Sequence, residues 1–193
     1  MTLLHISDTH GMHSRLGATP PADVLVHSGD FTHGGTENEV LDFLNWFIAL
    51  PYSQKIFVVG NHDLCLRDAL DIKDLPENVH FLQDRSVTIN DVTFFGLGYD
   101  HPEELIPNNV DILVTHEPPS EILDYSSGIH WGNIALRRRI ETVKPHFHLF
   151  GHAHEAYGIQ QKGCITFCNT SLLNDRNQLV NAPRLLNVSL RFF

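Results

Sequence analysis

KIFVVGNHD, residues 55–63, is a short apolar run that leads directly into Gly60 and then into Asn61, His62 and Asp63. A short run of this kind, ended by glycine, is typical of a buried β-strand. Ligands of α/β proteins bind beyond the carboxyl ends of such strands. We therefore expect the three polar side chains to lie at the edge of a sheet, where they can meet a ligand.

The same arrangement, an apolar run followed by side chains of metal-binding type, recurs four more times along the chain. Residues 3–6 precede Asp8 and His10, residues 24–28 precede Gly29-Asp30, residues 112–115 precede His116, and residues 147–150 precede Gly151-His152-Ala153-His154. A sheet that presents these strand ends at one edge would gather all of these side chains there. The repetition carries this prediction more strongly than any single motif does.

The rest of the pattern predicts an α/β (α+β) fold in which two packed β-sheets are flanked by helices. Thr36-Glu37-Asn38-Glu39 is a capping box that opens a helix, which Pro51 ends, and a second helix is expected over 131–143. Strands are expected over 2–6, 23–28, 55–59, 79–82, 87–89, 93–96, 111–115, 146–150, 155–160, 164–168 and 184–190. The strands 155–160 and 164–168 would form a hairpin across Gln161-Lys162-Gly163. Asn90-Asp91 would form a tight hairpin between 87–89 and 93–96. Residues 97–109 and 117–130 would be loops.

The composition suits a single globular domain over residues 1–193, with 42% hydrophobic residues and no apolar stretch long enough to span a bilayer. The net charge of -10 argues against an extended nucleic-acid face. No secretory leader is recognised, and three cysteines without a Cys-x-x-Cys pair indicate no disulfide framework. We therefore expect a cytoplasmic protein with no membrane partner; the sequence names no protein partner.

Imidazole and carboxylate groups are the side chains that divalent transition metals prefer. Asp8-x-His10 and His152-x-His154 each place two polar groups on one side of an extended segment. Asp30 can bridge two ions through its two oxygens, and Asn61 and His116 complete the candidate ligands. Seven ligands, one of them bridging, suit two metal ions of the kind that clamp the attacking and leaving oxygens of a phosphoryl transfer.

In this order, Asp-x-His, Gly-Asp, Gly-Asn-His-Asp, His and Gly-His-x-His resemble the calcineurin-like metallophosphoesterases, over residues 5–154. The resemblance implies a sandwich of two mixed β-sheets with flanking helices. It implies that Asp8, His10, Asp30 and His154 hold one metal and that Asp30, Asn61, His116 and His152 hold the other. It further implies that His62 protonates the leaving oxygen or steadies the phosphate charge, with a metal-bridging hydroxide as nucleophile.

Residues 113–119 and 149–158, together with Gly29-Asp30-Phe31-Thr32, look like the metallophosphoesterase-domain-containing branch, which is similar to cyclic-nucleotide phosphodiesterases. The chain departs from that branch in being short over 64–79 and 97–109, which would open its pocket. It also carries Glu117 where related proteins often have glycine, which would place a carboxylate beside the second metal.

These residues together predict a dimetal phosphoesterase that hydrolyses phosphodiester bonds of small nucleotide-type molecules. Manganese is the expected metal, and iron, zinc, nickel or cobalt would suit the same ligands. Asn61 and His62 are expected to contact substrate, with His13 and His33 as further candidates, whereas Trp46 and Trp131 are interpreted as packing anchors. The alternatives are a phosphomonoesterase or nuclease with the same chemistry, and a weakly active metal-binding scaffold.

Overall fold

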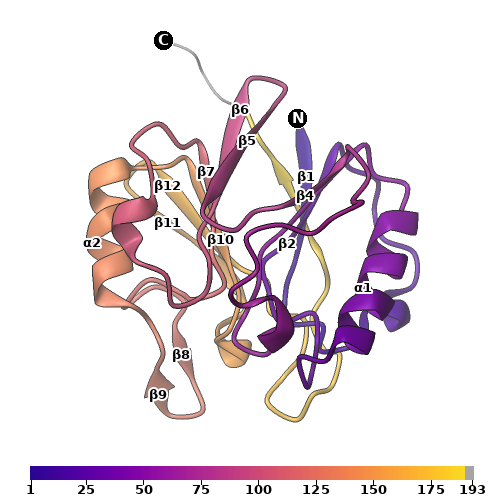
Figure 1. Ribbon diagram of the computed structural model, residues 1–193. Helices are drawn as coiled ribbons and strands as arrows, with labels where there is room; N and C mark the ends of the chain where they lie inside the picture. Colours follow the sequence, from indigo (N-terminus) through magenta and orange to yellow (C-terminus); the bar gives the residue numbers. More distant parts are fainter. Residues whose placement is uncertain (190–193) are drawn as a thin grey trace.

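A computed structural model describes residues 1–189 and contains two β-sheets that lie face to face between two helices (Figure 1). The first sheet has the strand order β13-β1-β2-β3-β4 and the second β11-β12-β10-β7-β6-β5. The helices are α1 (Glu37–Ala49) and α2 (Ile134–Val143). The strands are β1 (Thr2–Ile6), β2 (Val24–His27), β3 (Gln54–Phe57), β4 (Val79–Phe81), β5 (Arg85–Ile89), β6 (Val92–Gly96), β7 (Ile112–Val114), β8 (Tyr125–Ser126), β9 (Ile129–His130), β10 (Phe147–Phe150), β11 (Gly158–Lys162), β12 (Ile165–Asn169) and β13 (Arg184–Asn187).

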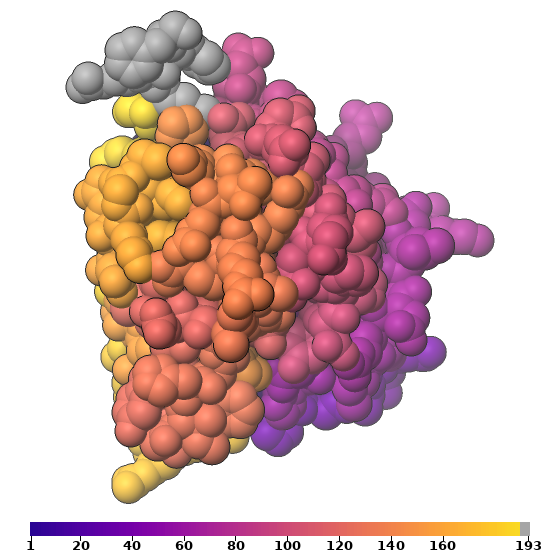
Figure 2. All heavy atoms as spheres, turned by 90° about the vertical axis from the view of Figure 1, so that its left-hand side faces the viewer, coloured from indigo at the N-terminus to yellow at the C-terminus, as the bar shows by residue number. Residues whose placement is uncertain are grey.

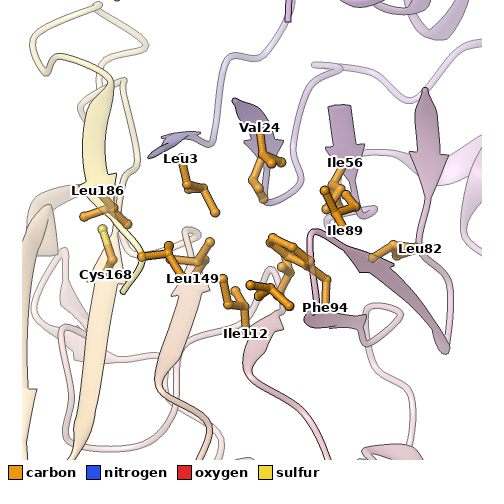
Figure 3. Close-up of a cluster of buried hydrophobic side chains, with 14 of the residues drawn as sticks. Leu3, Val24, Ile56, Leu82, Ile89, Phe94, Ile112, Leu149, Cys168 and Leu186 are labelled. Atoms are coloured by element: carbon orange, nitrogen blue, oxygen red, sulfur yellow. The ribbon is translucent and has the colours of Figure 1, made fainter. Parts of the chain in front are cut away.

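Alternate residues along each strand pack on opposite faces of its sheet, and this produces three apolar layers. Leu3 of β1 joins Ile112 and Leu149 of the second sheet in the layer between the two sheets (Figure 3). Its neighbour Leu4 packs against α1 instead. A third layer lies between the second sheet and α2 and contains Phe150. Because successive strand side chains point to opposite faces, apolar runs such as 3–6 supply two layers at once. The predicted two-sheet sandwich with flanking helices is confirmed.

The direction of the strands brings the five ligand-bearing loops to one edge. Strands β1, β2 and β3 pair in parallel, and so do β7 and β10 in the second sheet. Their carboxyl ends therefore meet at the lower edge in Figure 1, away from the N-terminus. The sandwich positions the candidate site at this edge.

Local capping and turn chemistry fix the ends of several elements. Thr36 forms the predicted capping box with Glu39 at the start of α1. Asn90 and Asp91 both have positive φ, at 51° and 63°, and form the predicted two-residue hairpin between Ile89 and Val92. Within the described residues, no helix is both long and apolar enough to cross a membrane.

Several predicted element boundaries were wrong. The second helix starts at Ile134 because the Asn133 side chain caps it by accepting the Leu136 amide. The loop over 117–130 contains the short β8–β9 hairpin. The last hairpin turns at Gly163, whose φ is 60°, so that Lys162 pairs with Ile165. The strand expected over 155–160 starts at Gly158, because residues 154–156 form a 3-10 turn. The closing strand ends at Asn187, and residue 190 of its expected range lies outside the described residues.

Candidate metal centre

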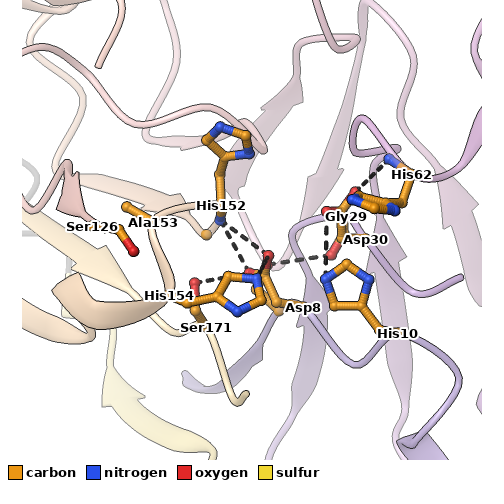
Figure 4. A network of polar contacts seen from close by, with 12 residues as sticks. Asp8, His10, Gly29, Asp30, His62, Ser126, His152, Ala153, His154 and Ser171 are labelled. Atoms are coloured by element: carbon orange, nitrogen blue, oxygen red, sulfur yellow. Dashed lines mark hydrogen bonds and ion pairs between the residues drawn. The ribbon is translucent and has the colours of Figure 1, made fainter. Parts of the chain in front are cut away.

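Asp8, His10 and His154 form one cluster of possible metal ligands. Their donor atoms lie within 4.8 Å of one another, and Oδ1 of Asp8 is 3.3 Å from Nε2 of His154 (Figure 4). Asp8 and His10 have positive φ, at 54° and 39°, immediately after β1. Non-glycine residues seldom adopt this conformation, and such strain is concentrated at functional sites.

Asn61, His116 and His152 form a second cluster beside the first. Oδ1 of Asn61 is 3.0 Å from Nε2 of His116 and 2.9 Å from Nδ1 of His152. These two imidazole nitrogens are 3.3 Å apart. The two strands that carry these histidines lie side by side in the second sheet, whereas Asn61 comes from the first. The cluster therefore spans both sheets.

Asp30 lies between the two clusters. Its Oδ2 is 3.6 Å from Nε2 of His10 and 3.3 Å from Nε2 of His116. Its Oδ1 accepts the amide of His62 at 2.8 Å, which fixes the carboxylate. Gly60 is required here, because a Cβ at that position would lie 2.1 Å from Oδ1 of Asp30. The structure thus brings all seven candidate ligands together, with one carboxylate shared between the groups.

Backbone carbonyls orient three of the imidazoles. His10 donates Nδ1–H to the Thr32 carbonyl at 3.0 Å, His116 to the Ser28 carbonyl at 2.9 Å, and His154 to the Asn174 carbonyl at 3.2 Å. A hydrogen bond from one ring nitrogen fixes the tautomer and leaves the other nitrogen as a metal ligand. In each of these residues the remaining nitrogen is Nε2, which faces the cluster.

The charges of the metal-free site favour a cation. Burial opposes the charge on Asp8, but its hydrogen bond with His154 and the neighbouring imidazoles outweigh burial and hold the Asp8 pKa well below its usual range. Burial also opposes the charge on His116, yet Asp30 and Asp8 raise the His116 pKa to about 10. The carboxylates therefore retain a proton on a buried imidazole that metal binding would displace.

The donor set fits divalent metal ions. Nε2 of His10 is buried and has no hydrogen-bond partner, although it points at Asp30. A buried polar atom without a partner is costly, and a metal ion would satisfy it together with the carboxylates. Imidazole, carboxylate and amide oxygen donors in this ratio suit transition metals.

His62 lies at the rim of the clusters. Its ring is 4.8 Å from that of His10, and its Nδ1–H donates to the His33 carbonyl at 2.8 Å. His33 is exposed, with its ring 6.1 Å from that of His62. His62 lines the pocket at the clusters, with Nε2 free of the His33 contact, whereas His33 is not among the lining residues.

Two sequence interpretations were wrong. His13 is buried, pairs with Asp42 at 3.2 Å and packs on Trp46, so its ring faces α1 rather than a substrate. Trp131 was expected to anchor the core, but it is 44% exposed and its ring lies 5.2 Å from that of His152. Glu117 accepts a hydrogen bond from Asn133 at 2.9 Å and lines, with His116, a small hollow beside the second cluster.

The site is a pocket of about 320 Å³. It is lined by Asp30, Asn61, His62, Ser126, Ser127, Trp131, His152, His154 and Asp175. This volume is at the small end of ligand pockets, which range over roughly 300–1,000 Å³. A larger hollow of about 420 Å³ lies along β4 and β5, but none of the candidate ligands lines it. The chemistry of the lining residues therefore identifies the smaller pocket, and not the larger hollow, as the candidate site.

Ser171 supports the first cluster from a strand end that the ligand pattern did not include. Its hydroxyl is 2.9 Å from Oδ2 of Asp8, and it follows β12, which runs parallel to β10. The same strand-end rule that places the five loops also places this residue near the site. Because Asp8 is ionised, it accepts the Ser171 proton more strongly than a neutral oxygen would.

Ser171→Ala is expected to weaken Mn²⁺ binding by roughly 10- to 100-fold, because residues that orient a ligand carry effects of that size. Calorimetric titration of metal-stripped protein would measure this loss. Ser86→Ala, at an exposed position on β5, serves as the control. Unchanged affinity in Ser171→Ala would show that Asp8 needs no support from this hydroxyl.

The chain is similar to several known proteins. The family model of the calcineurin-like phosphoesterases matches residues 1–156. A UPF0046 protein of Caenorhabditis elegans is 36% identical over 210 residues, covering 92% of this chain and 72% of its own. Human metallophosphoesterase domain-containing protein 1 is 32% identical over 227 residues, covering 95% of this chain and 69% of its own. The crystal structure of phosphopantetheinyl hydrolase from Mycobacterium tuberculosis is similar in fold, with a TM-score of 0.64 at 14% identity over 91% of this chain and 90% of that one. The chain belongs to the calcineurin-like phosphoesterase family.

Proposed function

We propose that this phosphoester hydrolase cleaves phosphodiester bonds of small nucleotide-type molecules with two divalent metal ions. One observation carries the proposal: five loops from two sheets bring seven donor side chains into two clusters that share Asp30. Asp8, His10, Asp30 and His154 would hold one ion, and Asp30, Asn61, His116 and His152 the other. When bound, such ions neutralise phosphate charge and lower the pKa of coordinated water.

His62 is proposed as the general acid. The His33 carbonyl accepts the proton on Nδ1, and this contact holds the ring in one orientation and leaves Nε2 for the substrate. In the imidazolium form of His62, Nε2 also carries a proton, which would pass to the oxygen of the departing alcohol and leave the neutral ring protonated on Nδ1. Asn61, the preceding residue, lines the same pocket and would help to hold the phosphate.

The charge of the pocket supports a diester rather than a monoester. Asp30 and Asp175 line it, and no lysine or arginine does so among the described residues. A diester carries one negative charge, whereas a monoester carries nearly two near neutral pH, so the diester meets less repulsion from Asp175, the lining carboxylate that is not a proposed metal ligand. The small volume also supports a compact substrate over a polymer.

Manganese is the metal we propose first, because mixed carboxylate, amide and imidazole donors accommodate it. We further propose the cytoplasm as the compartment. Cys65, Cys164 and Cys168 are all free, and free thiols are usual in a reducing environment.

Metal-stripped protein is expected to be inactive and to regain activity when it is reloaded with Mn²⁺. Reloaded protein should hydrolyse bis-p-nitrophenyl phosphate at least ~10-fold faster, in kcat/KM, than p-nitrophenyl phosphate, a difference of ~1.4 kcal/mol in transition-state stabilisation. Release of p-nitrophenolate measures both rates, and the same protein kept in chelator is the control. A preference for the monoester would indicate a phosphatase. Two bound metals without turnover of either ester would indicate a binding scaffold.

A further inference from the structure

Trp131 is an exposed aromatic residue within the pocket. It is 44% exposed, and its ring stands at 87° to that of His152 with centroids 5.2 Å apart. Because the two rings are nearly perpendicular, they do not stack on each other. An indole this exposed beside candidate metal ligands is unusual for a packing residue, since burial of a tryptophan removes a large apolar surface from water.

The β8–β9 hairpin and its neighbours hold Trp131 in place. Its Nε1–H donates to the Ser126 carbonyl at 3.2 Å, and its backbone amide donates to the Asp124 carbonyl at 2.9 Å. The next residue, Gly132, has no room for a Cβ, which would lie 2.4 Å from Ser120. The indole is therefore positioned before any ligand arrives, and a preorganised group loses little entropy on binding. Figure 2 shows the hairpin segment projecting at the lower end of the molecule.

The pocket has two chemically different ends. Ser126 lies at one end of the polar network and His62 at the other, with Asp8 and His154 between them (Figure 4). The Ser126 end also carries Asp175, whose carboxylate accepts the hydroxyls of Ser126 and Ser127. Because no lysine or arginine is among the described residues that line the pocket, the Asp175 carboxylate repels phosphate. This end is therefore suited to an uncharged part of the substrate.

We propose that Trp131 is a specificity-determining residue that stacks on an aromatic ring of the substrate. This ring belongs to the ester group that stays attached to phosphorus, and in a nucleotide-type substrate the ring is a nucleobase. This inference rests on the proposed function. If His62 protonates the leaving oxygen, the leaving group lies at the His62 end. In-line displacement places the attacking oxygen opposite the leaving oxygen, and the oxygen of the retained group lies in the plane between them, so the retained group projects to the side of this axis rather than toward the acid. Trp131, at the Ser126 end, then contacts the retained group, and the product is a nucleoside monophosphate.

The chain contains two tryptophans, Trp46 and Trp131, which makes the stack directly observable. Trp46 packs on His13 and Phe43 on the α1 side of the first sheet, so Trp46→Phe leaves Trp131 as the reporter. In Mn²⁺-loaded Trp46→Phe protein, adenosine 5′-monophosphate is expected to quench tryptophan fluorescence. Ribose 5-phosphate, which has the same phosphate but no base, is expected not to do so.

Binding affinities test the same contact without fluorescence. Adenosine 5′-monophosphate is expected to bind the Mn²⁺-loaded protein roughly 5- to 150-fold more tightly than ribose 5-phosphate, because one base–aromatic stack contributes ~1–3 kcal/mol. Trp131→Ala should abolish this preference, whereas Trp131→Phe should retain part of it. Ile129→Ala, at a 53% exposed position on the same hairpin outside the pocket, controls for loosening of the hairpin and should retain it in full.

Each outcome supports or overturns the inference. Equal affinity for the two ligands in the unaltered protein, or the same loss in Ile129→Ala as in Trp131→Ala, would overturn it. Hydrolysis of methyl p-nitrophenyl phosphate is measured separately. If that ester is cleaved while the base preference is absent, the inference fails and the proposed function stands. If no diester is cleaved but the base preference is present and depends on Trp131, the protein binds nucleotides and the hydrolytic proposal fails.

Discussion

Asp30→Asn is expected to lower kcat/KM for bis-p-nitrophenyl phosphate by ~10³-fold or more in protein incubated with Mn²⁺. Oδ2 of Asp30 lies between His10 of the first cluster and His116 of the second. The amide removes the negative charge and replaces one oxygen with a nitrogen that cannot accept. Loss of a shared ligand would remove several kcal/mol of the stabilisation that the metals give to the transition state, and each tenfold change in rate corresponds to ~1.36 kcal/mol.

The variant should fold, because asparagine tolerates the positive φ of 56° at this position and can still accept the His62 amide. Asp91→Asn is the matched control, since Asp91 also has positive φ but lies exposed in the β5–β6 turn. Metal analysis of the dialysed proteins should find fewer than two Mn²⁺ ions per chain in Asp30→Asn and two in Asp91→Asn. Two tightly bound ions together with near-normal turnover would show that Asp30 does not bridge them.

The arrangement of the candidate ligands could be predicted from the sequence because it depends on a local rule. Each apolar run forms a strand, each polar loop follows directly, and parallel pairing of β1 with β2 and of β7 with β10 brings the loop ends to one edge. Side-chain alternation along the strands is sufficient to predict the sandwich. Strand direction is sufficient to predict that Asp8 and His154 meet, although they are 146 residues apart in the sequence.

The wall of the pocket could not be predicted in the same way. The β8–β9 hairpin has two residues in each strand, too few to give a periodic pattern. Asp175 holds the hairpin by accepting the hydroxyls of Ser126 and Ser127, which lie 49 and 48 residues earlier in the chain. The exposure of Trp131 depends on these distant contacts. His13 shows the opposite error: its place in a polar loop suggested the rim, but packing on Trp46 turned it inward.

His62→Ala is expected to lower kcat for an aryl phosphodiester by ~10²- to 10⁴-fold, the usual contribution of a positioned general acid. The ring lies at the pocket with Nδ1 bound to the His33 carbonyl, so truncation removes the proton donor and leaves the seven candidate metal ligands in place. Metal content should therefore stay at the value of the unaltered protein. His33→Ala keeps that carbonyl but removes a neighbouring exposed ring, and its kcat should fall much less than that of His62→Ala.

The leaving group separates proton donation from simple charge stabilisation at His62. An acid matters most when the departing oxygen is basic, and it matters little when the anion is stable without a proton. A series of diesters from p-nitrophenyl to unsubstituted phenyl should thus show a deficit in His62→Ala that grows as the leaving phenol becomes a weaker acid. A deficit of the same size for every member would mean that His62 stabilises charge on the phosphate instead. In that case the leaving group need not lie at the His62 end, and the orientation assigned to the group stacked on Trp131 would lose its support.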